Sequence, residues 1–251
     1  MPFDPNVELR AEINYAISVV DTVLQCTDVL QRNQNAIEAH LYAIALHVTI
    51  LELLAGCIAL AETGRSAGIP ILLRSMYEAL VDLDNLVHVK GYYEHMEAAN
   101  LRQIIRTVRS PDLGALFDGS MGRNHEDLDA LVDQFETLKK RGMGPLSFER
   151  RCRLAQRSAE YETLYGLFCL DAHNNLAALA DRHIEELDPG KHFEIRILGE
   201  PHVRSVTMRL RFGVGFLIQS TEMIHGAFGT QLAIADELSK AHKARISSAR
   251  P

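Results

Sequence analysis

Tryptophan is absent from this chain, and glycine, proline and cysteine are scarce: its 251 residues include 16 Gly, 8 Pro and 4 Cys. With so few turn-forming residues and long runs of helix-forming ones, the composition favours an all-helical fold. The four cysteines lie far apart and form no Cys-x-x-Cys pair, which argues against a disulfide framework or a zinc knuckle. They are typical of reduced, mostly buried thiols in a cytoplasmic protein. These residues are Cys26, Cys57, Cys152 and Cys169.

An excess of positive charge is also lacking, since the formal net charge is −7. Non-specific binding of long duplex nucleic acid needs a basic surface, so we do not expect it here. The N-terminus has no basic-then-apolar signal pattern. The two most apolar windows, 43–60 and 212–228, contain polar residues such as Glu52 and Gln219, and we expect neither to span a membrane. A soluble, cytoplasmic protein is therefore expected.

What the chain does contain is apolar residues at helical spacing. We predict an all-α fold with one helical domain over 1–251, a bundle of about four long helices with shorter ones attached. Residues 193–197 alternate like a strand, but one strand cannot form a sheet, so we expect at most a short hairpin near 192–198. The expected helices are 6–31, one ending near 62, 69–88, 92–110, 124–142, one starting at 147, 161–186 and 202–243.

The stretch 69–86 is the most informative part of the sequence. Its apolar residues repeat at helical spacing, and Arg74 and Glu78 stand four residues apart just beside that apolar face, where they can pair. A charged pair is costly to bury unless it meets partners. One interpretation is an ion pair that fixes how two helices meet. The other is a polar centre inside the bundle, completed by His173 and Tyr165 from the helix predicted at 161–186.

Two motifs carry a resemblance to a known family. The segment 73–78, Leu-Arg-Ser-Met-Tyr-Glu, resembles the Arg-Ser-Leu-aromatic-Glu signature of the family catalogued as domain of unknown function 5677, and 161–173 is similar to its second motif, a Tyr-rich helix that leads into Ser-x-x-His. The resemblance covers roughly 39–186, but Leu170 stands where the family usually has serine. It implies a helical bundle with Arg74, Glu78 and His173 as signature positions, and it brings no established activity.

Further candidate binding residues lie inside these motifs and in a basic cluster. Tyr77, Tyr165 and Asp171 belong to the motifs, whereas Arg150 and Arg151 belong to the cluster. Such a cluster could hold RNA or a phosphate in spite of the acidic total. The alternative interpretation, a solvated helix face that balances acidic neighbours, is favoured. The cluster consists of Lys139, Lys140, Arg141, Arg150, Arg151, Arg153 and Arg157.

A metal site receives little support from the sequence. Glu222 and His225 form a Glu-x-x-His step, which places a carboxylate and an imidazole on one helix face. Di-iron bundles need two such steps and further carboxylates, and we find only one, so a structural role is favoured. His40 and His47 are two helical turns apart, too far for one metal, and we expect them to be core or helix-contact histidines.

Three functional hypotheses follow. The first is a non-enzymatic module that binds a ligand or partner, with Arg74, Glu78 and His173 as its polar cluster. The second is an RNA-directed nuclease or toxin-like protein of HEPN-like type, with His173 as acid or base and Arg74 stabilising phosphate charge. The third is a carboxylate–histidine metal enzyme. No cofactor is identified, and RNA or a small ligand remains open as partner. The apolar stripe of the last helix could exceed what one bundle covers, which is compatible with a homodimer.

Overall fold

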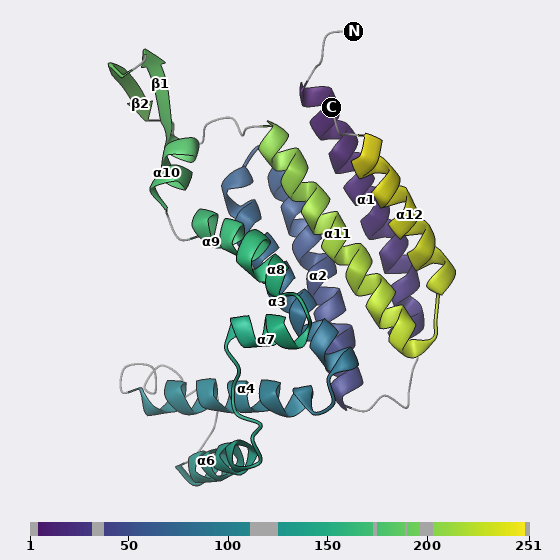
Figure 1. Cartoon of the computed structure of the whole chain (residues 1–251), viewed down its shortest axis with the longest axis vertical. Helices are drawn as coiled ribbons and strands as arrows, with labels where there is room; N and C mark the ends of the chain where they lie inside the picture. Colours follow the sequence, from purple (N-terminus) through teal and green to yellow (C-terminus); the bar gives the residue numbers. More distant parts are fainter. Residues whose placement is uncertain are drawn as a thin grey trace. The chain divides into compact units, whose positions relative to one another are not determined.

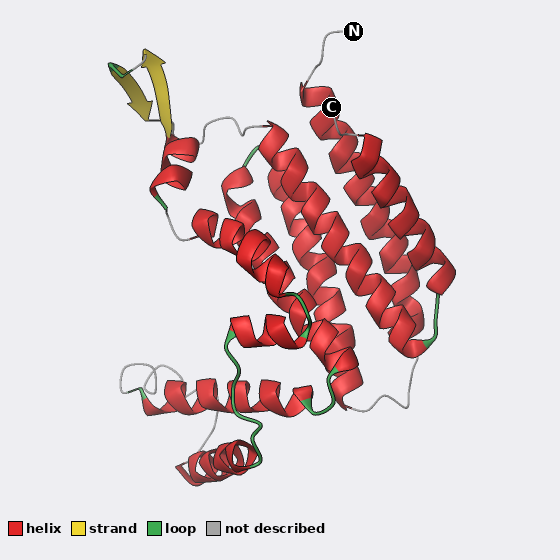
Figure 2. Cartoon of the chain, viewed as in Figure 1, coloured by secondary structure: helices red, strands yellow, loops and turns green. Residues whose placement is uncertain are grey.

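Over the residues that the structure describes, the protein is all-α apart from one small hairpin, as the composition predicts (Figure 2). The computed structural model describes residues 5–31, 38–110, 125–172, 175–188, 190–195 and 203–248. Contacts divide the chain into two compact units, one made of Met1–Val87 with Arg157–Pro251 and the other of His88–Gln156. The expectation of a single helical domain stays a prediction.

Five long helices build the first unit, and α11 is central because it contacts α1, α2 and α12 (Figure 1). Pro70, the second residue of α3, has no backbone N–H to donate. The N–H groups of a first helical turn have no partner within the helix, so proline is tolerated there and the helix starts where predicted. These helices are α1 (Pro5–Gln31), α2 (Glu38–Glu62), α3 (Ile69–His88), α11 (Val203–Phe228) and α12 (Leu232–Ser248), with a short 3₁₀ turn, η1 (Ser66–Gly68), before α3.

Helices α2, α3 and α11 approach closely at Gly213. A Cβ added there would lie 2.9 Å from Leu54 Cδ1 and 3.3 Å from Leu73 Cδ2. Both leucines are fully buried. The glycine therefore permits close packing, as its place in an apolar helical pattern predicts.

We expect Gly213→Ala to lower the free energy of unfolding by about 1–3 kcal/mol, because the new methyl group overpacks the core. Gly226→Ala is the matched control in the same helix, since a Cβ there meets no described atom within 4 Å. Alanine at that position should stabilise the helix by about 0.5–1 kcal/mol. Urea denaturation of both variants checks the pair, and equal effects of the two substitutions would contradict the packing argument.

The predicted helix over 202–243 is wrong in one respect: it is two helices. The chain turns between α11 and α12 at Gly229 and Gln231, which have φ of 65° and 45°. A left-handed glycine just past a helix is a common terminator, and the Thr230 amide donates to the His225 carbonyl at 2.9 Å. α12 then returns alongside α11 (Figure 1). The continuous apolar stripe concealed this turn.

The predicted helix over 161–186 is also wrong, because the chain there is divided into short pieces. Strands β1 and β2 pair antiparallel with Ile184 opposite Ile195, so the hairpin occupies 184–195, not 192–198. All the described residues of the two strands are exposed. The pieces are α8 (Ser158–Glu160), the π-helical segment η2 (Tyr161–Tyr165), α9 (Gly166–Ala172), α10 (Leu176–His183), β1 (Ile184–Asp188) and β2 (His192–Ile195).

The second unit contains α4 (Tyr92–Arg109), α6 (His125–Lys140) and α7 (Phe148–Leu154). Its small core is formed by Ala98, Leu101 and Leu138. Helix α7 begins as predicted, because the Ser147 hydroxyl caps it by accepting from the Arg150 amide at 3.3 Å. Helices α4 and α6 end near their predicted positions.

One helix among the described residues, α2, is long and apolar enough to cross a membrane by length and composition. Of its most apolar 18-residue window, 39% is buried within the protein. Its contacts with α1 and α11 are those of a bundle helix. The same test is passed by core helices of soluble proteins, so it is weak support for a span.

Candidate functional site

Arg74 and Glu78 form the ion pair that their spacing predicts. Arg74 Nε donates to Glu78 Oε1 at 3.1 Å along α3. Their neighbours Leu73, Met76 and Tyr77 are fully buried, so the pair lies at the margin of the core. The two side chains remain 28% and 33% exposed. The pair is therefore half-buried and reaches solvent.

Tyr165 joins this pair from the π-helical segment η2. Its hydroxyl accepts from Arg74 Nη2 at 3.0 Å and donates to Glu78 Oε1 at 3.0 Å. Every pair of these residues is thus hydrogen-bonded, and we call them the Arg74–Glu78–Tyr165 cluster. Tyr161, one turn earlier, stacks on Tyr165 with ring centres 5.4 Å apart and planes 20° apart.

The electrostatics of the cluster fix its protonation states. Burial, and then the Glu78 carboxylate beside it, raise the pKa of the Tyr165 hydroxyl, which stays protonated and can donate. Burial alone would lower the pKa of Arg74, but its hydrogen bond to Glu78 and the nearby Tyr165 raise it above its ordinary value. The cluster therefore consists of a cation, an anion and a neutral hydroxyl donor.

The other predicted residues have different surroundings. Tyr77 is fully buried, with its ring centre 6.3 Å from that of Tyr165 and 5.5 Å from that of Phe216, so it supports the cluster from within the core. His173 and the side chain of Asp171 lie outside the described residues. The predicted convergence of His173 with Arg74 and Glu78 stays a prediction.

The predicted binding residues Arg150 and Arg151 belong to the second unit. Arg150 is exposed on α7. Arg151 is half-buried, and its guanidinium carbon lies 4.8 Å from the centre of the Phe148 ring. Arg153 pairs with Glu149 at 2.6 Å. Whether this basic cluster binds RNA or a phosphate or is a solvated helix face stays a prediction.

A second polar cluster lies further along α3. Arg157 Nε donates to Asp84 Oδ2 at 2.7 Å, and Arg157 Nη1 donates to Glu160 at 2.8 Å and to the Gln219 side chain at 3.1 Å. The side chains of Arg157 and Asp84 are only 13% and 15% exposed. We call these residues the Arg157 clamp. It links α3, α8 and α11, and sequence reasoning placed Arg157 in a surface basic cluster instead.

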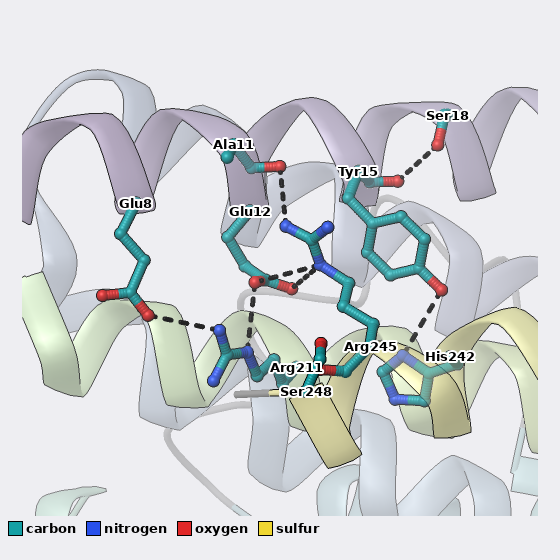
Figure 3. A network of polar contacts seen from close by, with 9 residues as sticks. All are labelled: Glu8, Ala11, Glu12, Tyr15, Ser18, Arg211, His242, Arg245 and Ser248. Carbon is teal, nitrogen blue, oxygen red and sulfur yellow. Dashed lines mark hydrogen bonds and ion pairs between the residues drawn. The ribbon is translucent and has the colours of Figure 1, made fainter. Parts of the chain in front are cut away.

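A third network, which sequence reasoning missed, joins α1, α11 and α12 (Figure 3). Glu12 is fully buried, and its carboxylate accepts from Arg211 Nε at 3.0 Å and from Arg245 Nε at 3.3 Å. Glu8 adds an outer contact to Arg211 at 3.3 Å. A carboxylate on an apolar helix stripe was the available signal, because Glu12 stands four and seven residues before the core residues Ala16 and Val19.

An aromatic pair extends the same network. The Tyr15 and His242 rings stack with centres 6.0 Å apart, and the Tyr15 hydroxyl lies 3.5 Å from His242 Nδ1 (Figure 3). Arg245 lies over the Tyr15 ring at 4.6 Å. Burial lowers the pKa of His242, which favours the neutral ring. These contacts fasten the C-terminal helix to the bundle.

The histidines of α2 and α11 form a buried polar chain. His47 Nδ1 lies 3.0 Å from the Ser220 hydroxyl and Nε2 lies 3.4 Å from that of Thr27. His225 meets His47 edge to face at 6.5 Å and contacts the Thr230 hydroxyl through Nδ1 at 2.8 Å. Both rings are fully buried, so these histidines contribute to the core.

Glu222 and His225, the weak metal candidates, have no third ligand nearby in the described residues. That part of the chain contains no group of three or more His, Cys, Asp or Glu side chains able to hold a metal ion. Glu222 is half-buried, and the His225 contact with Thr230 occupies one ring nitrogen.

Comparison with known proteins gives one match. No curated protein and no solved structure matches the chain. Residues 40–192 match the family described as a family of unknown function, DUF5677. This region includes α3 and η2, and hence all of the Arg74–Glu78–Tyr165 cluster. Because the match covers more than half of its residues, the chain belongs to the DUF5677 family.

Proposed function

We propose that this protein is a ligand-binding module and that the Arg74–Glu78–Tyr165 cluster is its binding centre. The observation that carries the proposal is the π-helical segment that brings Tyr161 and Tyr165 to a half-buried ion pair. Segments of π-helix are rare, and they occur frequently at functional sites. A ligand-binding role would therefore account for the π-helical segment beside the ion pair.

Stability alone does not account for the arrangement. An ion pair that is about one-third exposed contributes only about 0–1 kcal/mol to the free energy of unfolding. Nevertheless the pair is held by a hydroxyl from a distant segment, 87 residues away from Glu78 in the sequence. Tyr165 and Glu78 thus fix the orientation of a guanidinium that reaches solvent. A group held in its binding orientation before the ligand arrives loses less entropy on binding.

The chemistry of the cluster points to an organic anion. A guanidinium oriented by a carboxylate and a hydroxyl suits the oxygens of a phosphate or carboxylate. The half-buried Tyr161 ring, stacked on Tyr165, adds an aromatic surface beside it. A ligand with both an anionic group and a planar ring would use both features.

Adenosine 5′-monophosphate is a suitable probe, with inorganic phosphate and adenosine as its two halves. We expect the nucleotide to bind more tightly than either half in an NMR titration. Arg74→Lys should weaken nucleotide binding by about tenfold or more, because a hydrogen bond to a charged group contributes about 1.5–3 kcal/mol. Tyr165→Phe should weaken it less, since it removes only the orienting hydroxyl.

Arg153→Lys is the control, because Arg153 also pairs with a glutamate four residues away but is exposed on α7. It should leave nucleotide affinity unchanged. The proposal is contradicted if neither phosphate-bearing probe binds, or if Arg74→Lys and Arg153→Lys bind the nucleotide equally well.

A further inference from the structure

We infer that Arg157 and Asp84 are positioning residues that hold η2 against α3 and so place Tyr165 over Arg74 and Glu78. This inference deepens the proposed function, because it concerns how the same cluster is assembled. It starts from the Arg157 clamp, whose two central side chains are almost buried and bonded at 2.7 Å. No part of the Arg74–Glu78–Tyr165 cluster belongs to the clamp.

The two clusters mark an antiparallel alignment of the segments. Tyr165 contacts Arg74 and Glu78, whereas Arg157, eight residues before Tyr165, contacts Asp84, six residues after Glu78. On α3 the clamp residue Asp84 lies eight residues from the midpoint of the Arg74–Glu78 pair, so the sequence spacing is the same on both segments. The clamp and Tyr165 therefore fix the two ends of residues 157–165 against residues 76–84 of α3.

Between these anchors the segment is irregular, which is why an anchor is needed. Short α8 passes directly into the π-helical η2 and then into α9. A π-helical turn contains one residue more than an α-helical turn. If that extra residue were lost, Tyr165 would be rotated by about 100° around the helix axis, because each helical residue turns the chain by that angle. Arg157 also contacts Gln219 on α11, so the start of the segment is tied to two long helices.

The electrostatics of the clamp are suited to this role. Burial would lower the pKa of Arg157, but its bonds to Asp84 and Glu160 raise it, so the guanidinium stays charged. Charged pairs that are nearly buried add little net stability, and their best-attested use is to fix register. A clamp of this kind selects one alignment out of several.

The test uses tyrosine labelled with ¹³C at Cζ, whose resonance reports ionisation and hydrogen bonding of the hydroxyl. The Tyr165 signal is assigned as the one lost in Tyr165→Phe. Its neighbours Arg74, Glu78 and Cys169 all act on its pKa. In the native protein the signal should not titrate between about pH 7 and pH 11, beyond the ordinary tyrosine pKa of about 10.

We expect Arg157→Gln to shift the Tyr165 signal at neutral pH and to bring its titration down toward that ordinary value. Arg157→Lys should restore the native signal in part, and Asp84→Asn, a milder change, should shift it in the same direction. Arg153→Gln on α7 should change nothing. A native Tyr165 signal in Asp84→Asn and in folded Arg157→Gln would overturn the inference.

This readout involves no ligand, so it separates the two proposals. A Tyr165 signal that moves in a protein without affinity for the nucleotide would leave the positioning role intact and contradict the proposed function. In the opposite case, nucleotide binding depends on Arg74 but the Tyr165 signal does not respond to substitution of Arg157. That result would support the proposed function and contradict the positioning role. If Arg157→Gln fails to fold, Asp84→Asn and Arg157→Lys decide the question.

Discussion

Glu12→Gln is expected to lower the free energy of unfolding by about 3 kcal/mol. Glu12 is fully buried, and its carboxylate compensates the guanidinium groups of Arg211 and Arg245 (Figure 3). Removing one partner of a buried charge cluster leaves uncompensated charge and costs about 3–5 kcal/mol. We place the value at the lower end because the arginine side chains are 23% and 33% exposed and can be partly solvated.

Urea denaturation measures the loss, and Glu8→Gln is the matched control. Glu8 lies one turn earlier on α1 and contacts the same Arg211, but it is 34% exposed. Its substitution should cost below about 1 kcal/mol. Equal losses in the two variants would mean that burial of Glu12 does not govern the energetics of this network.

The contrast between Glu12 and the Arg74–Glu78 pair shows what sequence can predict. Arg74 and Glu78 are four residues apart on one strongly amphipathic helix, so their pairing follows from helix geometry alone. Tyr165 is predicted to face them because it lies two helical turns before His173, the candidate beside an apolar stripe. Glu12 on α1 lies 199 residues before Arg211 on α11 and 233 residues before Arg245 on α12. No local pattern specifies which helices become neighbours.

Helix boundaries also fall into those that local sequence signals predict and those that they do not. The start of α3 depends on Pro70 and the start of α7 on Ser147, both local signals that the sequence displays. The turn at Gly229 interrupts a pattern whose apolar stripe continues on both sides of it. The division of 161–186 was hidden for a similar reason, since each short piece keeps helical spacing of its apolar residues.

The proposed function depends on the region where local prediction failed. If residues 161–186 formed one regular helix, residue spacing alone would set the directions in which Tyr161 and Tyr165 face. The Arg157 clamp would then not be needed to choose between alignments of this segment on α3. The π-helical segment makes their placement a property of tertiary contacts with α3 and α11. Disagreement between local preference and observed structure is expected at functional sites.

Acidification is expected to destabilise the protein through His47. Burial, and then the neighbouring His225, lower the pKa of His47 from an ordinary 6.5 to about 4. The folded state therefore holds a neutral ring, whereas the unfolded chain binds a proton near pH 6.5. This contribution is fully present above about pH 6.5, is lost progressively as pH falls to about 4, and totals about 3 kcal/mol. Burial lowers the pKa of His225 as well, which acts in the same direction.

His47→Gln should flatten the pH dependence of unfolding between those values, because glutamine can still contact Ser220 and Thr27 but cannot be protonated there. Denaturant titrations at several pH values measure the slope. Cys57→Ala on the same helix is the control: it removes a fully buried side chain whose pKa burial raises to about 12. That variant should lose similar stability at every acidic pH and keep the native slope. The expected pH dependence arises because His47 stays neutral in the folded protein but is protonated in the unfolded chain at acidic pH. An unchanged slope in His47→Gln would therefore mean that another group causes the loss of stability.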